Sequence, residues 1–562
     1  MKYRTTNFNS FRTHGPAAII AALGLALAGC GGGSSSGGTD MDSSIQPNTP
    51  LQIAQESAEN YNDNENGVIT GETLSRWLND WENERPQGVT GRLVILQQGE
   101  GPEGVEYIRS DASDVYTYAL SASELRMDRS NGVIVTRTIV GDGPTMDALF
   151  EKYAIDPRED MIVCARGSGG SPNNQGRCWY TLRYWGVPAR NLAFLNGSYD
   201  WQVDPGNPYP MLATDFSTSP ATPPGNGTVS VRDMPEDNFA LIATIEDIMA
   251  IATPSPQNDT GDGVLVWDAR GLNQYSAGEA HELGQYGCAQ AYCGAVDDYM
   301  ATFQNNATRQ GHPHGTLQLQ FTRMLVAEEG NRFRDKAELA AYIHGETDAN
   351  GLGFVDYTYQ PVGVGNAYQP GDTVYVYCET TQRAQTTGLV SVAILGIPTR
   401  YYDGAMVEWN SLSHIVAENG LPILPHDSQW RTDLDDISFF RASNDPSKIA
   451  QRDIVDPYAE RSNAHLVEDQ AYKYDDGSDG DTGGDTGGDT GGDTGGDTGG
   501  DTGGDTGGDT GGDTGGDTGG DTGGDTGGDT GGDTGGDTGG DTGGDTGGDT
   551  GGGVEPPANP CG

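Results

Sequence analysis

The same order of segments occurs twice in the middle of this chain. The first copy runs strand, loop, helix and strand over residues 160–164, 165–176, 177–185 and 191–195. The second copy runs in the same order over residues 373–377, 378–383, 384–395 and around Tyr401. Short apolar runs suit buried parallel strands, and a helix between two of them supplies the crossover that such strands need. The repeated order predicts an α/β protein with two parallel sheets, each flanked by helices.

Composition limits the partners of the chain and sets one segment apart. Its 31 Lys and Arg residues against 82 Asp and Glu leave a net charge of −51 over 562 residues. Binding to nucleic acid needs clustered basic residues, so we expect no nucleic-acid partner. Residues 481–552 are Asp-Thr-Gly-Gly repeated, with no apolar side chain to bury, which predicts a disordered, solvated spacer. A calcium-binding array is the competing interpretation, but the repeat lacks the nine-residue period of calcium β-rolls.

The first residues have the pattern of an export signal. Residues 1–29 contain Lys2, Arg4 and Arg12, no acidic residue, and an apolar run that is too short to cross a membrane. The run ends in Leu-Ala-Gly-Cys, which resembles the bacterial lipoprotein signal and makes Cys30 the expected lipidation site. We therefore expect an exported protein held at the cell envelope by acyl chains, at the outer membrane or the periplasmic face and not in the cytoplasm.

Composition and the two copies together divide the chain. The residues after Cys30 are rich in Gly, Ser, Thr, Asp and Pro, which is typical of a flexible tether. The part between the tether and the repeat is long enough for two domains with separate cores. We predict a signal peptide, a flexible tether, a first domain, a second domain and a disordered repeat region, at residues 1–29, 30–60, 61–215, 228–470 and 479–553.

Short motifs around the two copies form an ordered set. In the first domain they lie at residues 176–186, 195–197 and 201. In the second domain they lie at residues 266–270, 275, 311–315, 377–378, 383–384, 402–404 and 408–409. In this order, over about residues 68–420, the set resembles the tandem-domain rhodaneses, the thiosulfate and 3-mercaptopyruvate sulfurtransferases. The resemblance implies two rhodanese-like domains, of which only the second is catalytic. Insertions at 280–308 and 346–368 depart from the family pattern.

Cys378 is the candidate nucleophile. It follows a predicted strand and precedes a predicted helix, so backbone N–H groups and the positive helix end can converge on its sulfur and favour the thiolate. A thiolate in this position can attack a sulfane sulfur and carry it as a persulfide. The resemblance implies this reaction for Cys378, with thiosulfate or 3-mercaptopyruvate as donor and a thiol or cyanide as acceptor. It also implies a catalytic role for Arg383 and a substrate-binding cradle made of Glu379, Thr380, Thr381 and Gln382.

The residues around Cys378 also test this interpretation. Four residues separate Cys378 from Arg383, whereas tyrosine-phosphatase-like enzymes have five, so the loop fits sulfur better than phosphate. Glu379 places a carboxylate beside the thiol, and Gln274 stands where the family has Arg; both differences disfavour an anionic donor. They keep open a second hypothesis, a catalytically inactive rhodanese-fold binding or scaffold lipoprotein of the cell envelope. A Cys378 side chain packed in the interior with no opening to solvent would contradict the enzymatic interpretation and leave only the second hypothesis.

The cysteine content fits an oxidising compartment. Apart from Cys30 and Cys378, the chain contains Cys164, Cys178, Cys288, Cys293 and Cys561. Cys288 and Cys293 are candidates for a local disulfide, whereas Cys164 and Cys178 either pair or remain buried thiols. Aligning the two copies places Ala165 opposite Cys378, so the first domain lacks the nucleophile. Cys164 lies one residue earlier and should face the other side of the strand.

Two pairs of polar residues are interpreted as parts of the scaffold. Asp268 and Arg270 match positions that form an ion pair in the family, and we expect a structural salt bridge at the end of a strand. His312 and His314 flank a proline. A role in stabilising that turn is favoured over metal binding, because no Cys or carboxylate stands beside them at ligand spacing.

One further stretch looks like part of a metal site. Residues 62–67 are similar to the first half of a calcium loop, but Thr73 stands where the glutamate ligand would be. We therefore interpret the stretch as a turn before a helix, with Thr70 as the N-cap. The sequence predicts neither a cofactor nor a metal.

Overall fold

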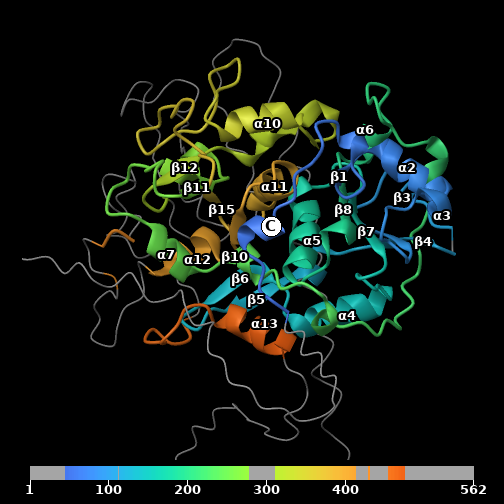
Figure 1. Ribbon diagram of the computed structural model, residues 1–562, viewed down its shortest axis with the longest axis horizontal. Coiled ribbons are helices and arrows are strands. Elements are labelled where there is room, and N and C mark those ends of the chain that lie inside the picture. Colours follow the sequence, from blue (N-terminus) through green and yellow to red (C-terminus); the bar gives the residue numbers. More distant parts are fainter. Residues whose placement is uncertain are drawn as a thin grey trace, which may run out of the picture. The chain divides into compact units, whose positions relative to one another are not determined.

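Two five-stranded sheets organise the described part of the chain (Figure 1). A computed structural model describes residues 45–111, 113–276, 311–412, 424, 428–430 and 454–474. All of these residues belong to one compact unit. Within these ranges no helix has both the length and the apolar character required to cross a lipid bilayer.

The two sheets share one topology. The first has the order β1-β8-β7-β2-β4 and is built from β1 (Gly67–Ile69), β2 (Leu93–Gln98), β4 (Val115–Ala119), β7 (Met161–Arg166) and β8 (Leu192–Leu195). The second has the order β10-β16-β15-β11-β12 and is built from β10 (Ile242–Ala243), β11 (Val264–Asp268), β12 (Thr316–Gln318), β15 (Thr373–Tyr377) and β16 (Thr399–Tyr402). All neighbouring strands in both sheets are parallel. The predicted fold class is confirmed, and the matching strand order supports a duplication.

Helices and small antiparallel pairs complete the fold. The α-helices are α1 (Pro50–Ile53), α2 (Gly71–Asn79), α3 (Trp81–Glu84), α4 (Gly143–Tyr153), α5 (Pro172–Tyr184), α6 (Tyr199–Gln202), α7 (Ile245–Ile251), α8 (Leu272–Ser276), α10 (Lys336–Ile343), α11 (Ala384–Leu389), α12 (Ala405–Leu412) and α13 (Ala464–Tyr474). The antiparallel pairs are β3 (Tyr107–Ile108) with β9 (Phe216–Ser217), β5 (Arg126–Ser130) with β6 (Val135–Val140), and β13 (Leu325–Val326) with β14 (Arg332–Phe333). A π-helical turn, Val390–Ile394, continues α11.

Alternating side chains place helices on both faces of the first sheet. Val94 and Leu96 of β2 belong to the same buried cluster as Trp179 of α5. The residue between them, Ile95, belongs to a separate cluster with Trp77 of α2. Successive strand residues point to opposite faces, so this near-continuous apolar strand is buried on both sides.

The second sheet is covered in the same way. Val376 of β15 shares a buried cluster with Leu389 of α11, whereas Tyr375 and Tyr377 cluster with Trp409 of α12. Helices α5 and α11 lie side by side between the two sheets (Figure 1). The core of the protein therefore continues from one half into the other through these two helices.

Helix α5 begins earlier than predicted. The stretch up to residue 176 is rich in Gly, Asn and Ser, which predicts a loop, yet α5 starts at Pro172. Ser171 caps the helix by accepting a hydrogen bond from the backbone N–H of Asn173, and proline occupies the first helical position, where its missing N–H has no cost. The same local chemistry confirms Thr70 as the N-cap of α2, because its side chain accepts a bond from the N–H of Thr73.

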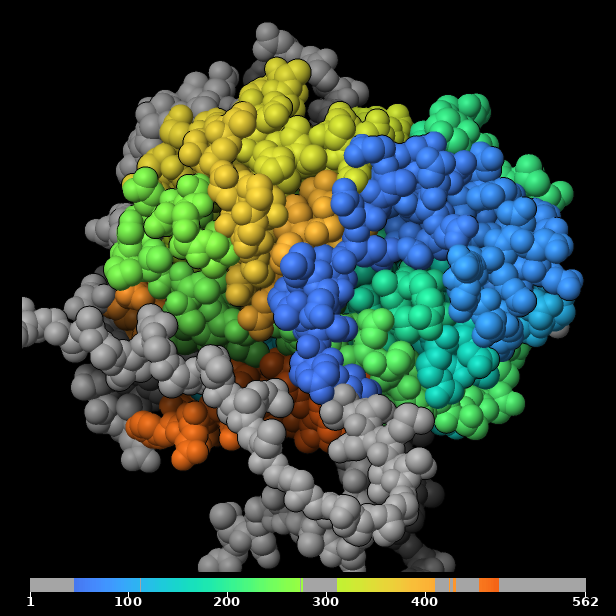
Figure 2. Space-filling view, in the orientation of Figure 1, coloured from blue at the N-terminus to red at the C-terminus, as the bar shows by residue number. Residues whose placement is uncertain are grey.

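The predicted tether is wrong in its second part. Residues 50–53 form α1, which has a capping box between Thr49 and Gln52. The backbone N–H groups of Gln55 and Ser57 then donate to carbonyls of the π-helical turn after α11, over 2.8 and 3.0 Å. Figure 2 shows this stretch in blue, lying on the surface against atoms of the second half, in orange and yellow. Local capping and these long-range bonds order a segment that composition alone assigns to a linker.

Candidate active site

Cys378 lies directly after β15, one of the three inner strands of the second sheet. Tyr377, the last residue of that strand, is paired with Asp268 at the end of β11, and its carbonyl accepts the N–H of Ala269 over 2.9 Å. The carboxyl ends of parallel strands are where α/β proteins place their ligand sites. The structure therefore places the candidate nucleophile at the expected edge of the sheet.

The Cys378 loop, residues 378–383, is held through its carbonyl groups. The carbonyls of Cys378 and Glu379 accept the backbone N–H groups of Met406 and Val407, in the first turn of α12, over 3.2 and 3.1 Å. Thr381 has a positive φ of 62°, which is rare for a β-branched residue. Its hydroxyl donates to the carbonyls of the two residues that precede Gly404, over 2.6 and 2.9 Å. These bonds fix the strained turn in place.

Three N–H groups of the same loop, unlike the carbonyl groups of Cys378 and Glu379, lack hydrogen-bond partners among the described residues. Within the described part of the chain, the backbone N–H groups of Thr380, Thr381 and Gln382 donate to no acceptor. All three residues are at most 3% exposed, and buried N–H groups without a partner are rare in native proteins. Three such donors in succession form a potential binding site for an anionic group.

The equivalent loop of the first half is closed. There the N–H groups of Gly167, Ser168 and Gly169 donate to the carbonyls of Gln98 and Glu100 and to the carboxylate of Asp200, over 2.9, 2.9 and 3.1 Å. Because their acceptors belong to the protein, these donors are not available to a ligand. Open donors are thus a property of the Cys378 loop and not of the fold.

The thiol itself is buried. The Cys378 side chain is 0% exposed, whereas an active sulfur carrier was expected to open to solvent. The expectation of an open thiol is therefore wrong for this conformation of the chain. The loop residues Glu379 and Arg383 are buried as well, at 2% and 5% exposure. A donor reaches the thiol only after some covering element has moved.

A buried ion network lies beside the thiol. The predicted ion pair of Asp268 and Arg270 is confirmed: their side chains form several contacts, the shortest of 2.6 Å, and neither is exposed. Arg270 also contacts the carboxylate of Glu379 over 3.4 Å. Tyr377 donates its hydroxyl to Asp268 over 3.1 Å. Glu379 is thus partly neutralised by Arg270, so its charge acts on the site less than the sequence suggests.

Arg383, the predicted catalytic cation, lies at the other end of the loop. Its Nη1 donates to the side-chain oxygen of Gln274 in α8. An amide accepts this bond without cancelling the charge of the guanidinium, as a carboxylate would. The Gln274 departure therefore orients Arg383.

The cysteines of the first half resolve one open alternative. Cys164 and Cys178 form a disulfide with an S–S distance of 2.06 Å, which joins β7 to α5. Cys164 and Ala165 belong to different buried clusters on opposite faces of the sheet. Cys164, and not Ala165, shares its cluster with Cys378, so the predicted alignment of Ala165 with Cys378 is wrong. The predicted pairing of Cys288 with Cys293, the lipidation of Cys30 and the position of Cys561 lie outside the described residues.

Comparison with known proteins gives only distant similarity. No family model matches the chain, and no curated protein matches it. Among solved structures, the chain is similar to the Tum1 protein of Saccharomyces cerevisiae, with 12% identity, coverage of 62% of this chain and 95% of that one, and a TM-score of 0.38. It is also similar to 3-mercaptopyruvate sulfurtransferase from Leishmania major, with 12% identity, 62% and 75% coverage, and a TM-score of 0.36. A third is an anaerobic ergothioneine biosynthesis enzyme from Chlorobium limicola, with 12% identity, 62% and 70% coverage, and a TM-score of 0.37. At these values the similarity carries no argument about activity.

The first half contributes polar contacts to the Cys378 loop that the sequence does not reveal. Asn174, in the first turn of α5, accepts a bond from Gln382 over 2.7 Å, and Thr138 of β6 donates to the carbonyl of Thr380 over 2.9 Å. Arg177 of α5 forms a fully buried ion pair with Asp403 over 2.9 Å. These partners are more than 200 residues apart, so no local pattern identifies them.

The two histidines stabilise backbone turns, as predicted. The Nδ1 of His312 bonds to the carbonyl of Tyr275 over 2.8 Å, and its ring stacks on that tyrosine with centroids 3.6 Å apart. Because a carbonyl only accepts, Nδ1 carries a proton. Burial lowers the pKa of His312 to about 3, so the imidazole is neutral near pH 7. His314 makes a similar bond to the carbonyl of Thr253 over 2.9 Å.

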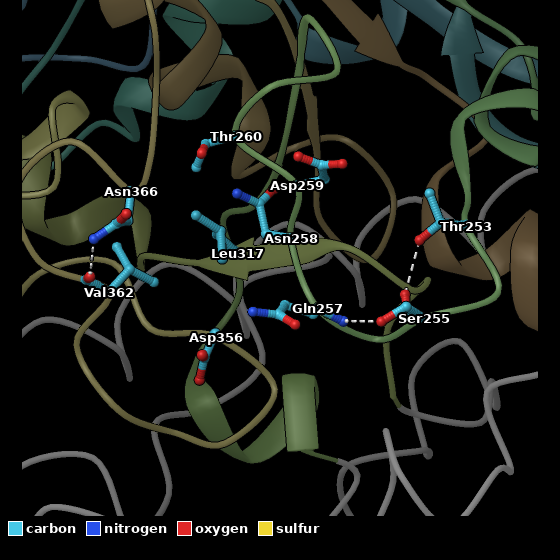
Figure 3. Close-up of a pocket in the computed structure, with 10 residues that line it drawn as sticks. All are labelled: Thr253, Ser255, Gln257, Asn258, Asp259, Thr260, Leu317, Asp356, Val362 and Asn366. Carbon is cyan, nitrogen blue, oxygen red and sulfur yellow. Dashed lines mark hydrogen bonds between the residues drawn. The ribbon is translucent and has the colours of Figure 1, made fainter.

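A cavity of about 670 Å³ lies elsewhere in the second half (Figure 3). It is lined by Thr253, Ser255, Gln257, Asn258, Asp259, Thr260, Leu317, Asp356, Val362 and Asn366. None of the residues that line it belongs to the Cys378 loop, so the cavity is not the site of the cysteine chemistry.

Proposed function

We propose that this chain is a sulfurtransferase that carries a sulfane sulfur as the persulfide of Cys378. The observation that carries the proposal is the set of three N–H groups, at Thr380, Thr381 and Gln382, that find no acceptor within the described residues. Preorganised N–H donors directly after a cysteine suit an anionic sulfur, because they gain a partner when the anion forms. The closed loop of the first half, which lacks the cysteine, is consistent with this assignment.

The reaction takes two displacement steps. In the first, the Cys378 thiolate attacks the outer sulfur of a donor such as thiosulfate. The new S–S bond forms while the donor's own S–S bond breaks, and sulfite leaves with the electron pair. In the second step a thiol or cyanide attacks the outer sulfur, and Cys378 leaves as a thiolate. The protein returns to its starting state without net oxidation or reduction.

The charges of the site fit transfer of an anionic sulfur better than the sequence alone suggests. Asp268, Arg270 and Glu379 form one buried network, in which Arg270 offsets one of the two carboxylate charges. Arg383 bonds to the neutral amide of Gln274. Thiosulfate and 3-mercaptopyruvate both remain within this proposal as donors.

Mass spectrometry tests the proposal directly. The full-length protein is incubated with thiosulfate, with 3-mercaptopyruvate and with polysulfide, and the peptide that contains Cys378 is weighed. We expect this peptide to gain one sulfur, and the gain to be absent in Cys378→Ala. The peptides of the Cys164–Cys178 disulfide serve as an internal control that should not change. No gain with any of the three donors would contradict the proposal.

The complete burial of Cys378 favours a second candidate function. In this alternative the chain is an inactive rhodanese-fold scaffold, whose thiol never meets a donor. The same experiment separates the two candidates, because a scaffold shows no sulfur gain even when it is given hours with each donor. We place the sulfurtransferase first for two reasons. The burial of Cys378 is a property of one conformation, whereas the N–H groups of Thr380, Thr381 and Gln382 need a ligand to be satisfied.

We also propose that the protein is exported and anchored through lipid on Cys30. The Cys164–Cys178 disulfide supports this proposal, since such bonds persist in oxidising compartments and are rare in the cytosol. Metabolic labelling with a radioactive fatty acid tests it. Label is expected in the wild type and not in Cys30→Ala, and the variant should move from the membrane fraction to the soluble fraction.

A further inference from the structure

The last described helix, α13, is bound by a polar face. His465, Asp469 and Lys473 recur every fourth residue, so they lie on one side of the helix, and they are only 2%, 1% and 4% exposed. A surface helix ordinarily buries an apolar stripe, and ionisable side chains are seldom buried unless they are paired. The α13 interface is therefore partly polar: these three buried side chains lie beside the apolar contacts of Leu466 and Tyr472 with the core.

One arginine connects this helix to the β5–β6 hairpin. Arg129 of β5 contacts the carboxylate of Asp469 over 2.9 Å and the carbonyl of His465 over 2.9 Å. Asp469 also accepts the hydroxyl of Tyr184 over 2.6 Å. At the start of α13, the N–H of Ala464 donates to the carbonyl of Asn131, in the hairpin turn, over 3.0 Å. The helix and the hairpin thus form one bonded assembly.

The hairpin in turn rests on the Cys378 loop and on α12. Thr138 donates its hydroxyl to the carbonyl of Thr380 over 2.9 Å, from a backbone with a φ of 58° that β-branched residues rarely adopt. The amide of Asn131 donates to the carboxylate of Glu408 over 2.7 Å. Both contacts come from the first half and both reach the elements around the buried thiol. A strained residue at such a contact marks a place where two conformations can be close in energy.

We propose that α13 is a strap that keeps the β5–β6 hairpin on the Cys378 loop, and that release of the strap uncovers the thiol. A polar interface suits this purpose, because its charged groups regain their hydration when the helix leaves, so that docking has a small net free energy. An apolar interface would have no such compensation. The covering of the thiol by the hairpin is inferred from these contacts and from the burial of Cys378, whereas its consequence, control of sulfur transfer, rests on the proposed function.

A substitution at Asp469 is expected to release α13, and a substitution at the neighbouring Glu468 serves as the control. Asp469→Asn keeps the shape of the side chain but leaves the buried Arg129 without its counter-charge, which is strongly destabilising for the docked helix. Glu468 contacts the same arginine over 3.3 Å but is 65% exposed at its side chain, so Glu468→Gln should change little. Lys473→Met, at the other end of the buried face, is a second way to loosen the helix.

Two measurements on the full-length chain test the strap. Hydrogen exchange of residues 464–474 reports whether the helix leaves, and exchange of β2 and β7 verifies that each variant is folded. The rate at which 4,4′-dithiodipyridine modifies Cys378, followed on its peptide by mass spectrometry, reports the exposure of the thiol. We expect Asp469→Asn and Lys473→Met to raise both the exchange of α13 and the labelling rate of Cys378 at least tenfold, and Glu468→Gln to change neither more than twofold.

Three results would overturn the inference. The first is faster exchange of α13 with no change in the labelling of Cys378. The second is a wild-type labelling rate that already equals the rate in urea, since the thiol would then not be covered. The third is a helix that stays protected in both variants, because it would be a fixed element. A Cys378 that is labelled but never gains sulfur would leave the strap intact and remove only the proposed function.

Discussion

The ion pair between Arg177 and Asp403 is the sharpest test of how the two halves are joined. Arg177 belongs to α5 in the first half, and Asp403 follows β16 in the second. Both side chains are fully buried, and the carboxylate also accepts the N–H of Val140 over 2.8 Å. Replacing the guanidinium by an apolar side chain of similar length, Arg177→Met, would leave a buried carboxylate with that single donor.

The expected cost follows from the burial. Removing one partner of a buried ion pair destabilises a protein by about 3–5 kcal/mol, which is a large share of a typical total stability of roughly 5–15 kcal/mol. Burial already raises the pKa of Asp403 even with Arg177 present. Without the arginine that pKa rises further above its unfolded value, so the lost stability is recovered at low pH, where the acid is neutral. We expect the cost of Arg177→Met to be larger at pH 8 than at pH 5.

Urea unfolding followed by tryptophan fluorescence measures this cost, since Trp179 and Trp185 lie on or beside α5. Asp403→Asn and the double variant complete a double-mutant cycle. The double variant should lose less than the sum of the two single losses, because no unpaired charge remains in it. Arg158→Met, which breaks the exposed pair with Asp156, is the control and should cost less than about 1 kcal/mol. Additive losses that do not change with pH would refute the reasoning.

Three further predictions concern single sites. Burial lowers the pKa of His312 to about 3, so the stability that the neutral ring contributes is complete above its unfolded pKa of about 6.5 and is lost as the pH falls. The unfolding free energy of the wild type should therefore fall between pH 7 and pH 5, and in His312→Asn this fall should be smaller by about 2 kcal/mol. Replacing both Cys164 and Cys178 by Ala opens a cross-link between residues 14 positions apart and should cost about 2–4 kcal/mol in urea unfolding; a loss below 1 kcal/mol would contradict this. Glu379→Gln removes one negative charge from the residue next to the thiol. Because Arg270 offsets only part of that charge, persulfide formation from thiosulfate should become several-fold faster. An unchanged or slower rate would contradict this and show that pairing with Arg270 already cancels the charge.

The placement of the site follows from local sequence. The run at 373–377 is apolar and β-branched, so it forms a strand, and the residue after a strand of a parallel sheet lies at the edge where ligands bind. The position of Cys378 could be predicted for this reason, whereas the ion pair of Asp268 with Arg270 is implied by the family resemblance. The early start of α5 could not be predicted from composition, because Gly, Asn and Ser indicate a loop unless the cap and the proline are weighed.

The long-range contacts around the site could not be predicted at all. Thr138 and Arg129 make two of them, although both residues lie far from Cys378 in the sequence and carry no motif. Their partners, Thr380 and Asp469, are 242 and 340 residues away. Pairs at such separations are set by how the halves pack, and a single sequence records only the local preferences of each segment. The exposure of the thiol is a property of that packing.

The duplicated fold gives an internal reason to assign the chemistry to one half. Both sheets have the same strand order, and in both a loop follows the fourth strand and leads into the central helix. In the first half Arg166, the last residue of that strand, bonds to the carbonyls of Gly330 and Asn331 in the second half, and the N–H groups of the loop are satisfied within the protein. In the second half the corresponding N–H groups are open and follow a cysteine. The same fold thus contains one loop whose N–H groups are satisfied within the protein and one loop whose N–H groups are available to a ligand. The difference between the two loops arises from their residues and not from the architecture.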